Sequence, residues 1–201
     1  MDEKELLMTL AAQGGNIITT KAAEAAGISR AMLSKLCNAG RIQRIAQGQY
    51  IFVDDMPDEL LSISLRTAHL VFSHETALFL HGISDRTPFM HSVTSPANKV
   101  PSPVLREECK IYYIKPELYE LGRITMATPF GNQVPCYDLE RTVCDILRSR
   151  NKVGTETFLS ALRQYAASPK KDLNKLNLYA KKMRLTNVVR QYLEVLLCAM
   201  P

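Results

Sequence analysis

The sequence predicts an α+β fold in which a small N-terminal winged helix-turn-helix precedes a larger α+β domain. Two short helical patterns separated by a glycine are followed directly by a β-prone run with a glycine at its tip. After an acidic break that contains proline, helical and β-prone segments mix, which indicates a small, mostly antiparallel sheet with C-terminal helices. The expected boundaries are 1–53 for the first domain, 54–58 for a linker and 59–201 for the second domain.

Length and composition favour an ordered protein. The chain has 201 residues, of which 46% are hydrophobic, enough to bury a core. Its net charge of +5 indicates contact with a polyanion only where the positive charges cluster. The N-terminus is acidic and amphipathic, unlike a signal peptide, and no apolar run is long enough to span a bilayer, so we expect a cytoplasmic protein. The scattered cysteines predict neither a disulfide framework nor a zinc site, and no cofactor is expected.

A helix-turn-helix is expected near the N-terminus. A first helix is predicted over 2–13, where leucines recur at helical spacing before two glycines. Thr19 or Thr20 can cap a second helix over 21–26, and Gly27 can adopt the left-handed conformation of a tight turn. A third helix then completes the motif.

The third helix has the character of a DNA-reading helix. Ser29 is its expected cap, and it runs to about residue 39 with Leu33 and Leu36 on its apolar face. The opposite face is small, polar and cationic. Arg and Asn can bond guanine and adenine bidentately, Ser and Lys can reach phosphates, and Ala permits close approach.

A β-hairpin is predicted after this helix, because β-prone segments at 41–46 and 49–53 flank Gln47-Gly48. This hairpin is the expected wing, and the region from 21 to 53 holds five basic residues against the single acid Glu24. The alternative is a helix-turn-helix that serves only as a packing unit. The residues expected to contact DNA are Lys21, Arg30, Ala31, Ser34, Lys35, Asn38, Arg41, Arg44, Gln47 and Gln49.

The second domain mixes helices and strands. Ser73 and Asp138 are the expected caps of two of its helices. Strands 123–128 and 134–137 form an expected hairpin. The remaining expected elements are helices at 60–70, 74–85 (with Gly82 as its stop), 139–150, 156–167, 169–183 and 187–199, and strands at 90–94 and 110–114.

The whole chain resembles the AbiEi family of antitoxins from bacterial abortive-infection toxin-antitoxin systems. The resemblance rests on "GRIQRIAQGQYIF", "FSHETALFLHGISDRTP" and "TPFGNQVPCYDLERTVCDILR", in that order. It implies a winged-helix repressor that binds inverted repeats in its own promoter and counteracts a nucleotidyltransferase-like toxin in phage defence, without a stable complex with that toxin. In the family the wing tip often has a basic residue or proline before its glycine, whereas Gln47 and Gln49 flank Gly48 here.

Carboxylates at Asp138, Glu140 and Asp145 raise an alternative function. Such a group can hold a divalent metal, and the second domain would then modify the toxin covalently or act on nucleic acid. Arg141 lies between the acids on one helix face, which favours capping and ion pairing instead. His74 and His81 have no carboxylate or cysteine beside them that completes a metal site. We therefore expect no metal and no catalytic residue.

The most basic segment of the chain runs from 163 to 190, where eight basic residues face the single acid Asp172. Leu173, Leu176, Ala180 and Met183 are expected to form the inner face of its central helix. The exposed cations are either a solvated face or a surface for nucleic acid or for neutralising the toxin. The residues concerned are Lys170, Lys171, Lys175, Lys181, Lys182 and Arg184.

The sequence contains no heptad repeat or long apolar helix that would enforce a dimer. We therefore expect a monomer in solution and several copies on promoter DNA, because one small winged helix reads only a short half-site.

Overall fold

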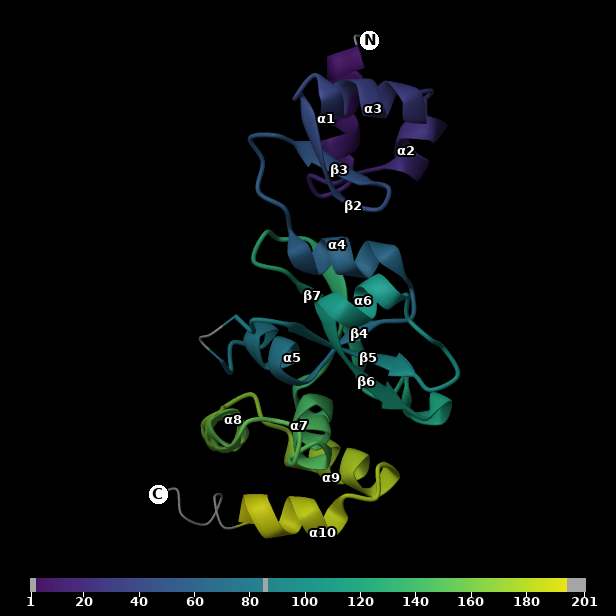
Figure 1. Cartoon of the computed structure of the whole chain (residues 1–201). Helices are drawn as coiled ribbons and strands as arrows, with labels where there is room; N and C mark the ends of the chain where they lie inside the picture. The colour runs from purple at the N-terminus through teal and green to yellow at the C-terminus, as the bar shows by residue number, and fades with distance from the viewer. Residues whose placement is uncertain (1–2, 85–86, 195–201) are drawn as a thin grey trace. The chain divides into compact units, whose positions relative to one another are not determined.

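Two units make up the chain in the computed structural model, which describes residues 3–84 and 87–194 (Figure 1). Unit 1 contains the chain up to Arg66 together with Thr128–Asn132, and unit 2 contains Thr67–Ala127 and the chain from Gln133 onward. Within the described part of the chain, no helix combines the length and apolar character needed to cross a membrane.

Unit 1 contains all the elements that the sequence predicts for its first 53 residues, and one more. The additional element is β1, a two-residue strand that pairs antiparallel with β3 and gives a three-stranded sheet in the order β1-β3-β2. Of the first predicted helix, Asp2 lies outside the described residues. The elements are α1 (Glu3–Gln13), β1 (Ile18–Thr19), α2 (Thr20–Ala25), α3 (Arg30–Asn38), β2 (Ile42–Ala46), β3 (Gln49–Phe52) and α4 (Glu59–Arg66).

Side-chain caps fix where the two helices of the helix-turn-helix begin. The Thr19 hydroxyl accepts a hydrogen bond from the Ala22 amide at 3.1 Å, and the Ser29 hydroxyl accepts one from the Met32 amide at 3.2 Å. Between the helices Gly27 has a φ of 87°, which confirms the predicted left-handed turn. The helices then pack on a common core of Leu7, Ala11, Ile18, Ala23, Ile28, Leu33, Leu36 and Ile42.

The end of the expected linker is built into unit 1. Asp58 is buried, and one of its carboxylate oxygens accepts the Leu61 amide at 3.1 Å. The other accepts hydrogen bonds from the Thr128 hydroxyl at 2.6 Å and the Asn132 amide at 2.8 Å. Asp58 therefore fixes the start of α4 and the turn that follows β7, while a functional division at 54–58 stays a prediction.

Unit 2 has a five-stranded sheet in the order β6-β5-β4-β8-β7. The sheet is mixed, so the prediction of a mostly antiparallel sheet is wrong. The β4–β8 and β5–β6 pairs are parallel, because a helical crossover links β5 to β6 and because β4 pairs with a strand far along the chain. The strands are β4 (Val71–Phe72), β5 (His91–Pro96), β6 (Cys109–Ile114), β7 (Arg123–Ala127) and β8 (Gln133–Tyr137).

Most helices of unit 2 follow the sequence patterns with adjusted ends, but those at 103–108 and 116–118 were not expected, and the Ser73 side chain makes no capping hydrogen bond at the helix it precedes. The helix expected to reach residue 70 ends at Arg66 in unit 1, because 71–72 form the short strand β4. The helix expected over 187–199 is seen as α10 and a π-helical turn, η2, and its remainder lies outside the described residues. The helical elements are α5 (His74–Leu80), α6 (Pro103–Glu108), η1 (Pro116–Leu118), α7 (Leu139–Arg148), α8 (Thr155–Ala167), α9 (Leu173–Lys182), α10 (Thr186–Val189) and η2 (Arg190–Glu194).

The core between α7, α8 and α9 holds unit 2 together. Val143, Leu162, Leu176 and Ala180 are each at most 2% exposed in this cluster. Leu173, which the sequence analysis placed on the inner face of α9, is 39% exposed, so that prediction is wrong. The reason is that α9 begins only at Leu173, directly after the cap Asp172, and the next two residues are not buried either.

Candidate nucleic-acid interface

Helix α3 presents the polar face that the sequence predicts. Leu33 and Leu36 are 0% and 4% exposed, so the apolar side of the helix is committed to the core of unit 1. The remaining side is open to solvent and contains two cations, a hydroxyl, an amide and a methyl group. Its exposed residues are Arg30, Ala31, Ser34, Lys35 and Asn38.

Arg30 is not a free cation. Its Nε donates to the Glu24 carboxylate at 2.7 Å, which places the acid of α2 beside the first turn of α3. Both side chains are exposed, at 76% and 44%, so the pair is weak and solvent-screened. In the sequence Glu24 enters only the charge balance of this region, and no local pattern predicts the pairing.

The hairpin after α3 adds further exposed polar groups. Arg41, Arg44 and Gln47 are exposed, as is Lys21 on α2. The Nε of Arg44 donates to the Ala46 carbonyl at 3.2 Å, next to an irregularity in the β2–β3 register. The hairpin thus keeps its cations on the surface.

Gln49 behaves differently from Gln47, although both flank Gly48. Gln49 is 4% exposed, its Nε2 donates to the Ser62 carbonyl at 3.0 Å, and its Oε1 accepts the Ser62 hydroxyl at 2.6 Å. This side chain joins β3 to α4. It is not available as the surface DNA contact that the sequence analysis expected.

The three carboxylates considered for catalysis are used by the fold. Asp138 caps α7 by accepting the Arg141 amide at 2.8 Å, and it also accepts the Tyr179 hydroxyl at 2.9 Å. Glu140 accepts the Asp172 amide at 2.9 Å. Asp145 is fully buried against Arg141. The acids therefore do not form an open set facing a common substrate position.

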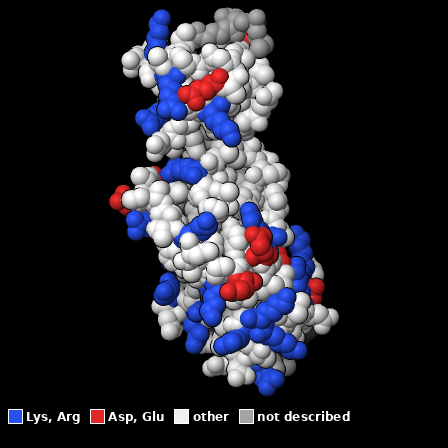
Figure 2. Space-filling view, turned by 90° about the vertical axis from the view of Figure 1, so that its right-hand side faces the viewer, with Lys and Arg blue, Asp and Glu red and all other residues white. Residues whose placement is uncertain are grey.

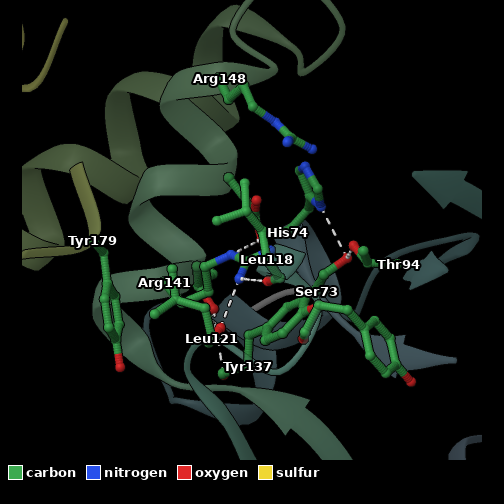
Figure 3. Close-up of polar contacts among 12 residues, drawn as sticks. Ser73, His74, Thr94, Leu118, Leu121, Tyr137, Arg141, Arg148 and Tyr179 are labelled. Carbon is green, nitrogen blue, oxygen red and sulfur yellow. Dashed lines mark hydrogen bonds and ion pairs between the residues drawn. The ribbon is translucent and has the colours of Figure 1, made fainter. Parts of the chain in front are cut away.

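Figure 3 shows Arg141 pointing into the interior of unit 2. Its Nη1 donates to the carbonyls of Leu118 and Leu121 at 2.7 and 2.6 Å, and its Nε donates to Asp145 at 3.0 Å. Burial raises the pKa of the Asp145 carboxyl, while the nearby Arg141 guanidinium acts in the opposite direction.

The two histidines considered for a metal site contact different groups and share no partner in the hydrogen bonds described below. His74 lies between hydroxyls, with Nδ1 2.9 Å from Ser73 Oγ and Nε2 3.0 Å from Ser149 Oγ (Figure 3). His81 Nε2 is 2.8 Å from the Tyr137 carbonyl. Among the residues that the structure describes, no three His, Cys, Asp or Glu side chains are placed to hold a metal ion.

The basic C-terminal segment divides into free and engaged cations. Lys175 Nζ lies 2.8 Å from Asp138 and 3.8 Å from Glu140, and Lys171 Nζ donates to the Ser168 carbonyl at 3.3 Å. Figure 2 shows Lys and Arg side chains gathered over the lower part of unit 2, with few acids among them. The exposed members of the predicted set are Lys170, Lys181, Lys182 and Arg184.

Known proteins resemble this chain in two ways, through a sequence family that matches part of unit 1 and through a solved structure with a similar fold. Residues 5–53 match the family described as "Transcriptional regulator, AbiEi antitoxin", which confirms the resemblance for this segment and supports an antitoxin and regulator role. No curated protein gives a significant sequence match. The fold is similar to the crystal structure of the RV2827C protein from Mycobacterium tuberculosis, with a TM-score of 0.66 and 15% identity over 97% of this chain and 80% of that one.

Proposed function

We propose that this protein is a DNA-binding antitoxin that represses its own operon and counteracts a nucleotidyltransferase-like toxin in bacterial phage defence. The observation that carries the proposal is the exposed polar and cationic face of α3, which lies within the segment that matches AbiEi antitoxin regulators. With the β2–β3 hairpin as its wing, unit 1 has the parts of a winged helix-turn-helix. A cytoplasmic location fits this role.

On DNA, α3 is the helix that enters the major groove. Arg30 and Asn38 read base edges, Ser34 and Lys35 contact phosphates, and Ala31 permits close approach. The surrounding contacts to the backbone come from Lys21, Arg41, Arg44 and Gln47. Gln49 is left out because it is buried.

Two copies occupy an inverted repeat. A single unit 1 reads only a short half-site, and two half-sites spaced by whole helical turns supply the specificity that one lacks. The chain is a monomer before it binds, and DNA brings the copies together.

Neutralisation of the toxin belongs to the part of the chain after the linker. That part has its own core and its own exposed cations, Lys170, Lys181, Lys182 and Arg184, which belong to unit 2, whereas α3 belongs to unit 1. It acts without catalysis and without a stable complex with the toxin. The partners of Asp138, Glu140 and Asp145 support a structural role for these acids, which disfavours the enzymatic alternative.

The test is promoter binding by a triple variant, Arg30→Ala, Lys35→Ala and Asn38→Ala, measured by gel shift and footprinting. Each bidentate base contact that is lost weakens specific binding by about 1 to 3 kcal/mol. The matched control is Lys4→Ala on α1, an exposed lysine outside the proposed interface. Promoter binding by the triple variant equal to that of the control would remove α3 from the interface.

A further inference from the structure

A pocket in unit 2 lies apart from all the residues discussed so far for DNA or toxin. It has a volume of about 540 Å³ and lies between strand β6 and the end of α7. Its chemistry comes from three cations and two tyrosines: Lys110, Tyr112, Tyr113, Arg148 and Lys152. The volume is within the range of about 300 to 1,000 Å³ typical of small-molecule sites.

The side chains that line this pocket carry a net positive charge. Lys110 Nζ lies 3.0 Å from the Glu75 carboxylate and 3.2 Å from the Lys152 carbonyl, so its charge is balanced and its position fixed. Arg148 donates through Nη2 to the Tyr113 carbonyl at 3.3 Å, and in the described part of the chain it forms no ion pair, although its charge also acts on the buried Asp145 carboxyl, whose main partner is Arg141. Lys152 is exposed at the rim. Two positive charges therefore remain after the Lys110–Glu75 pair is counted.

The inner wall of the pocket is polar and rigid. Tyr112 stacks on His74 with ring centroids 3.4 Å apart and an angle of 11° between the rings. The Tyr112 hydroxyl is buried beside the Lys110 ammonium group, and among the described residues no hydrogen bond to it meets strict geometry. The Ser149 hydroxyl at the wall is 3.0 Å from His74 Nε2. A buried hydroxyl without a well-aligned hydrogen bond gains stability when a ligand or water supplies one.

The backbone behind this wall is strained. His74 has a φ of 46°, in the left-handed region that favours glycine. Such strain persists where the surroundings hold it, and it gathers at functional sites. Here a chain of hydroxyls holds the ring, since Thr94 donates to Ser73 Oγ at 2.8 Å and that oxygen is 2.9 Å from His74 Nδ1 (Figure 3).

We propose that this pocket binds a mononucleotide through its phosphate. Guanidinium and ammonium groups recognise phosphate, and Arg148 can do so with parallel N–H donors. Tyr113, which is 46% exposed, supplies a flat ring on which a base stacks. Arg148 and Lys152 hold the phosphate, Lys110 is held in position by Glu75, and the Tyr112 and Ser149 hydroxyls complete the polar wall.

The test is calorimetric titration of the full-length protein with inorganic phosphate, AMP and ATP. We expect both nucleotides to bind more tightly than phosphate. Arg148→Gln and Lys152→Gln should each weaken nucleotide binding about tenfold. Tyr113→Leu should reduce the affinity for AMP and leave that for phosphate unchanged. Lys115→Gln, an exposed lysine outside the pocket lining, is the matched control and should bind as the unaltered chain does.

Several results would overturn the proposal. They are no heat of binding with any of the three probes at millimolar concentration, equal affinity for phosphate and AMP, or nucleotide binding that the pocket variants leave unchanged. A single-stranded oligonucleotide that binds more tightly than ATP with the same dependence on Arg148 and Lys152 would also overturn it, in favour of a nucleic-acid surface. Thermal melting of each variant shows whether it is folded. Lys152 is exposed at the rim, so Lys152→Gln remains usable if Arg148→Gln does not fold.

Discussion

Arg141 and Asp145 form an ion pair 3.0 Å long inside α7 in which neither side chain is exposed to solvent. The guanidinium also lies 4.1 Å from the centre of the Tyr137 ring and binds two carbonyls of the segment before β7. Among the described residues, Arg141 Nη2 and Asp145 Oδ1 have no hydrogen-bond partner. The pair therefore has a defined geometry, but not all of its hydrogen-bonding atoms have partners. For this reason the cost of removing one member differs from the cost of removing both.

Removing one partner should be worse than removing both. Arg141→Met leaves the buried Asp145 carboxylate unpaired and should lower the free energy of unfolding by about 3 to 5 kcal/mol. The double variant Arg141→Met/Asp145→Leu should recover part of this loss, but not all of it, because the Leu118 and Leu121 carbonyls still lose their donor. Urea denaturation of both variants measures the difference. A double variant less stable than Arg141→Met would contradict the prediction.

Stability should depend on the protonation of His74. Burial lowers the pKa of His74 well below its usual 6.5, and the nearby cations Arg148, Lys110 and Arg141 lower it further. Below pH 6.5 the unfolded chain binds a proton that the folded chain does not. The free energy of unfolding should therefore fall as the pH decreases from 6.5 toward the lowered pKa, by at most about 1.4 kcal/mol per pH unit.

The measurement is urea denaturation between about pH 7.5 and pH 5, above the range where most carboxylates titrate. His74→Gln, which has no titrating ring, is the comparison variant and should show a flatter profile. Parallel profiles for the two proteins would assign the pH dependence to other groups.

Local sequence patterns predicted unit 1 well. Caps at Thr19 and Ser29 and the turn at Gly27 depend on residues close in sequence, and the structure confirms all three. Unit 2 depends more on distant pairings. The two-residue strand β4 is too short for a period-two pattern, and its pairing with β8 crosses more than sixty residues, so the mixed sheet was not predictable.

Which side chains are exposed was predictable for α3 and less so for the hairpin. Periodicity separates the buried from the exposed face of α3, because Leu33 and Leu36 fix its orientation. At the wing, Gln47 and Gln49 have the same side chain and differ only in whether a residue from elsewhere in the chain contacts it. The partner of Gln49 is Ser62, on a helix 13 positions away, and no local pattern reports that contact.

The two wing-tip glutamines should therefore separate stability from DNA binding. Gln49→Ala removes both hydrogen bonds between this side chain and Ser62, whose hydroxyl keeps only the 3.4 Å contact from Arg66 Nη2, and should lower the free energy of unfolding by about 1 to 3 kcal/mol. Gln47→Ala should change stability by less than about 0.5 kcal/mol, because Gln47 is exposed. Denaturation and gel shifts on both variants provide the check. Equal stability of the two variants would mean that the Gln49–Ser62 contact contributes nothing.

The negative charge of Glu24 should lower the affinity of the protein for DNA. Its carboxylate lies 2.7 Å from Arg30 Nε, and it brings a negative charge to the edge of the proposed interface. Glu24→Gln removes that charge and should tighten binding to all sequences by about 2-fold to 10-fold, with a larger effect at low salt. Fluorescence anisotropy at several salt concentrations measures it. Glu5→Gln on α1 is the control, and equal effects of the two variants would show that only net charge matters.

The exposed lysines of α9 should matter for neutralising the toxin, and Lys175 should matter for folding. Hydrogen bonding to Asp138 raises the pKa of Lys175, and burial opposes that shift. Lys175→Glu puts a third acid beside Asp138 and Glu140 and should destabilise the protein by on the order of 1 kcal/mol, reduced by solvent screening. Lys181 and Lys182 are exposed and belong to none of the ion pairs found in the described chain.

Lys181→Glu/Lys182→Glu should keep the free energy of unfolding within about 0.5 kcal/mol of the unaltered chain while it abolishes protection of cells from the cognate toxin. Reversing two charges repels the anionic surface that the basic patch is proposed to contact, whereas Lys181→Gln/Lys182→Gln should give an intermediate effect. Promoter repression, which uses α3, should not change in either variant. If the double glutamate variant protects toxin-expressing cells as well as the unaltered chain does, these lysines form only a solvent-exposed surface and have no role in neutralising the toxin. Loss of repression together with protection would instead show that the two activities share one surface.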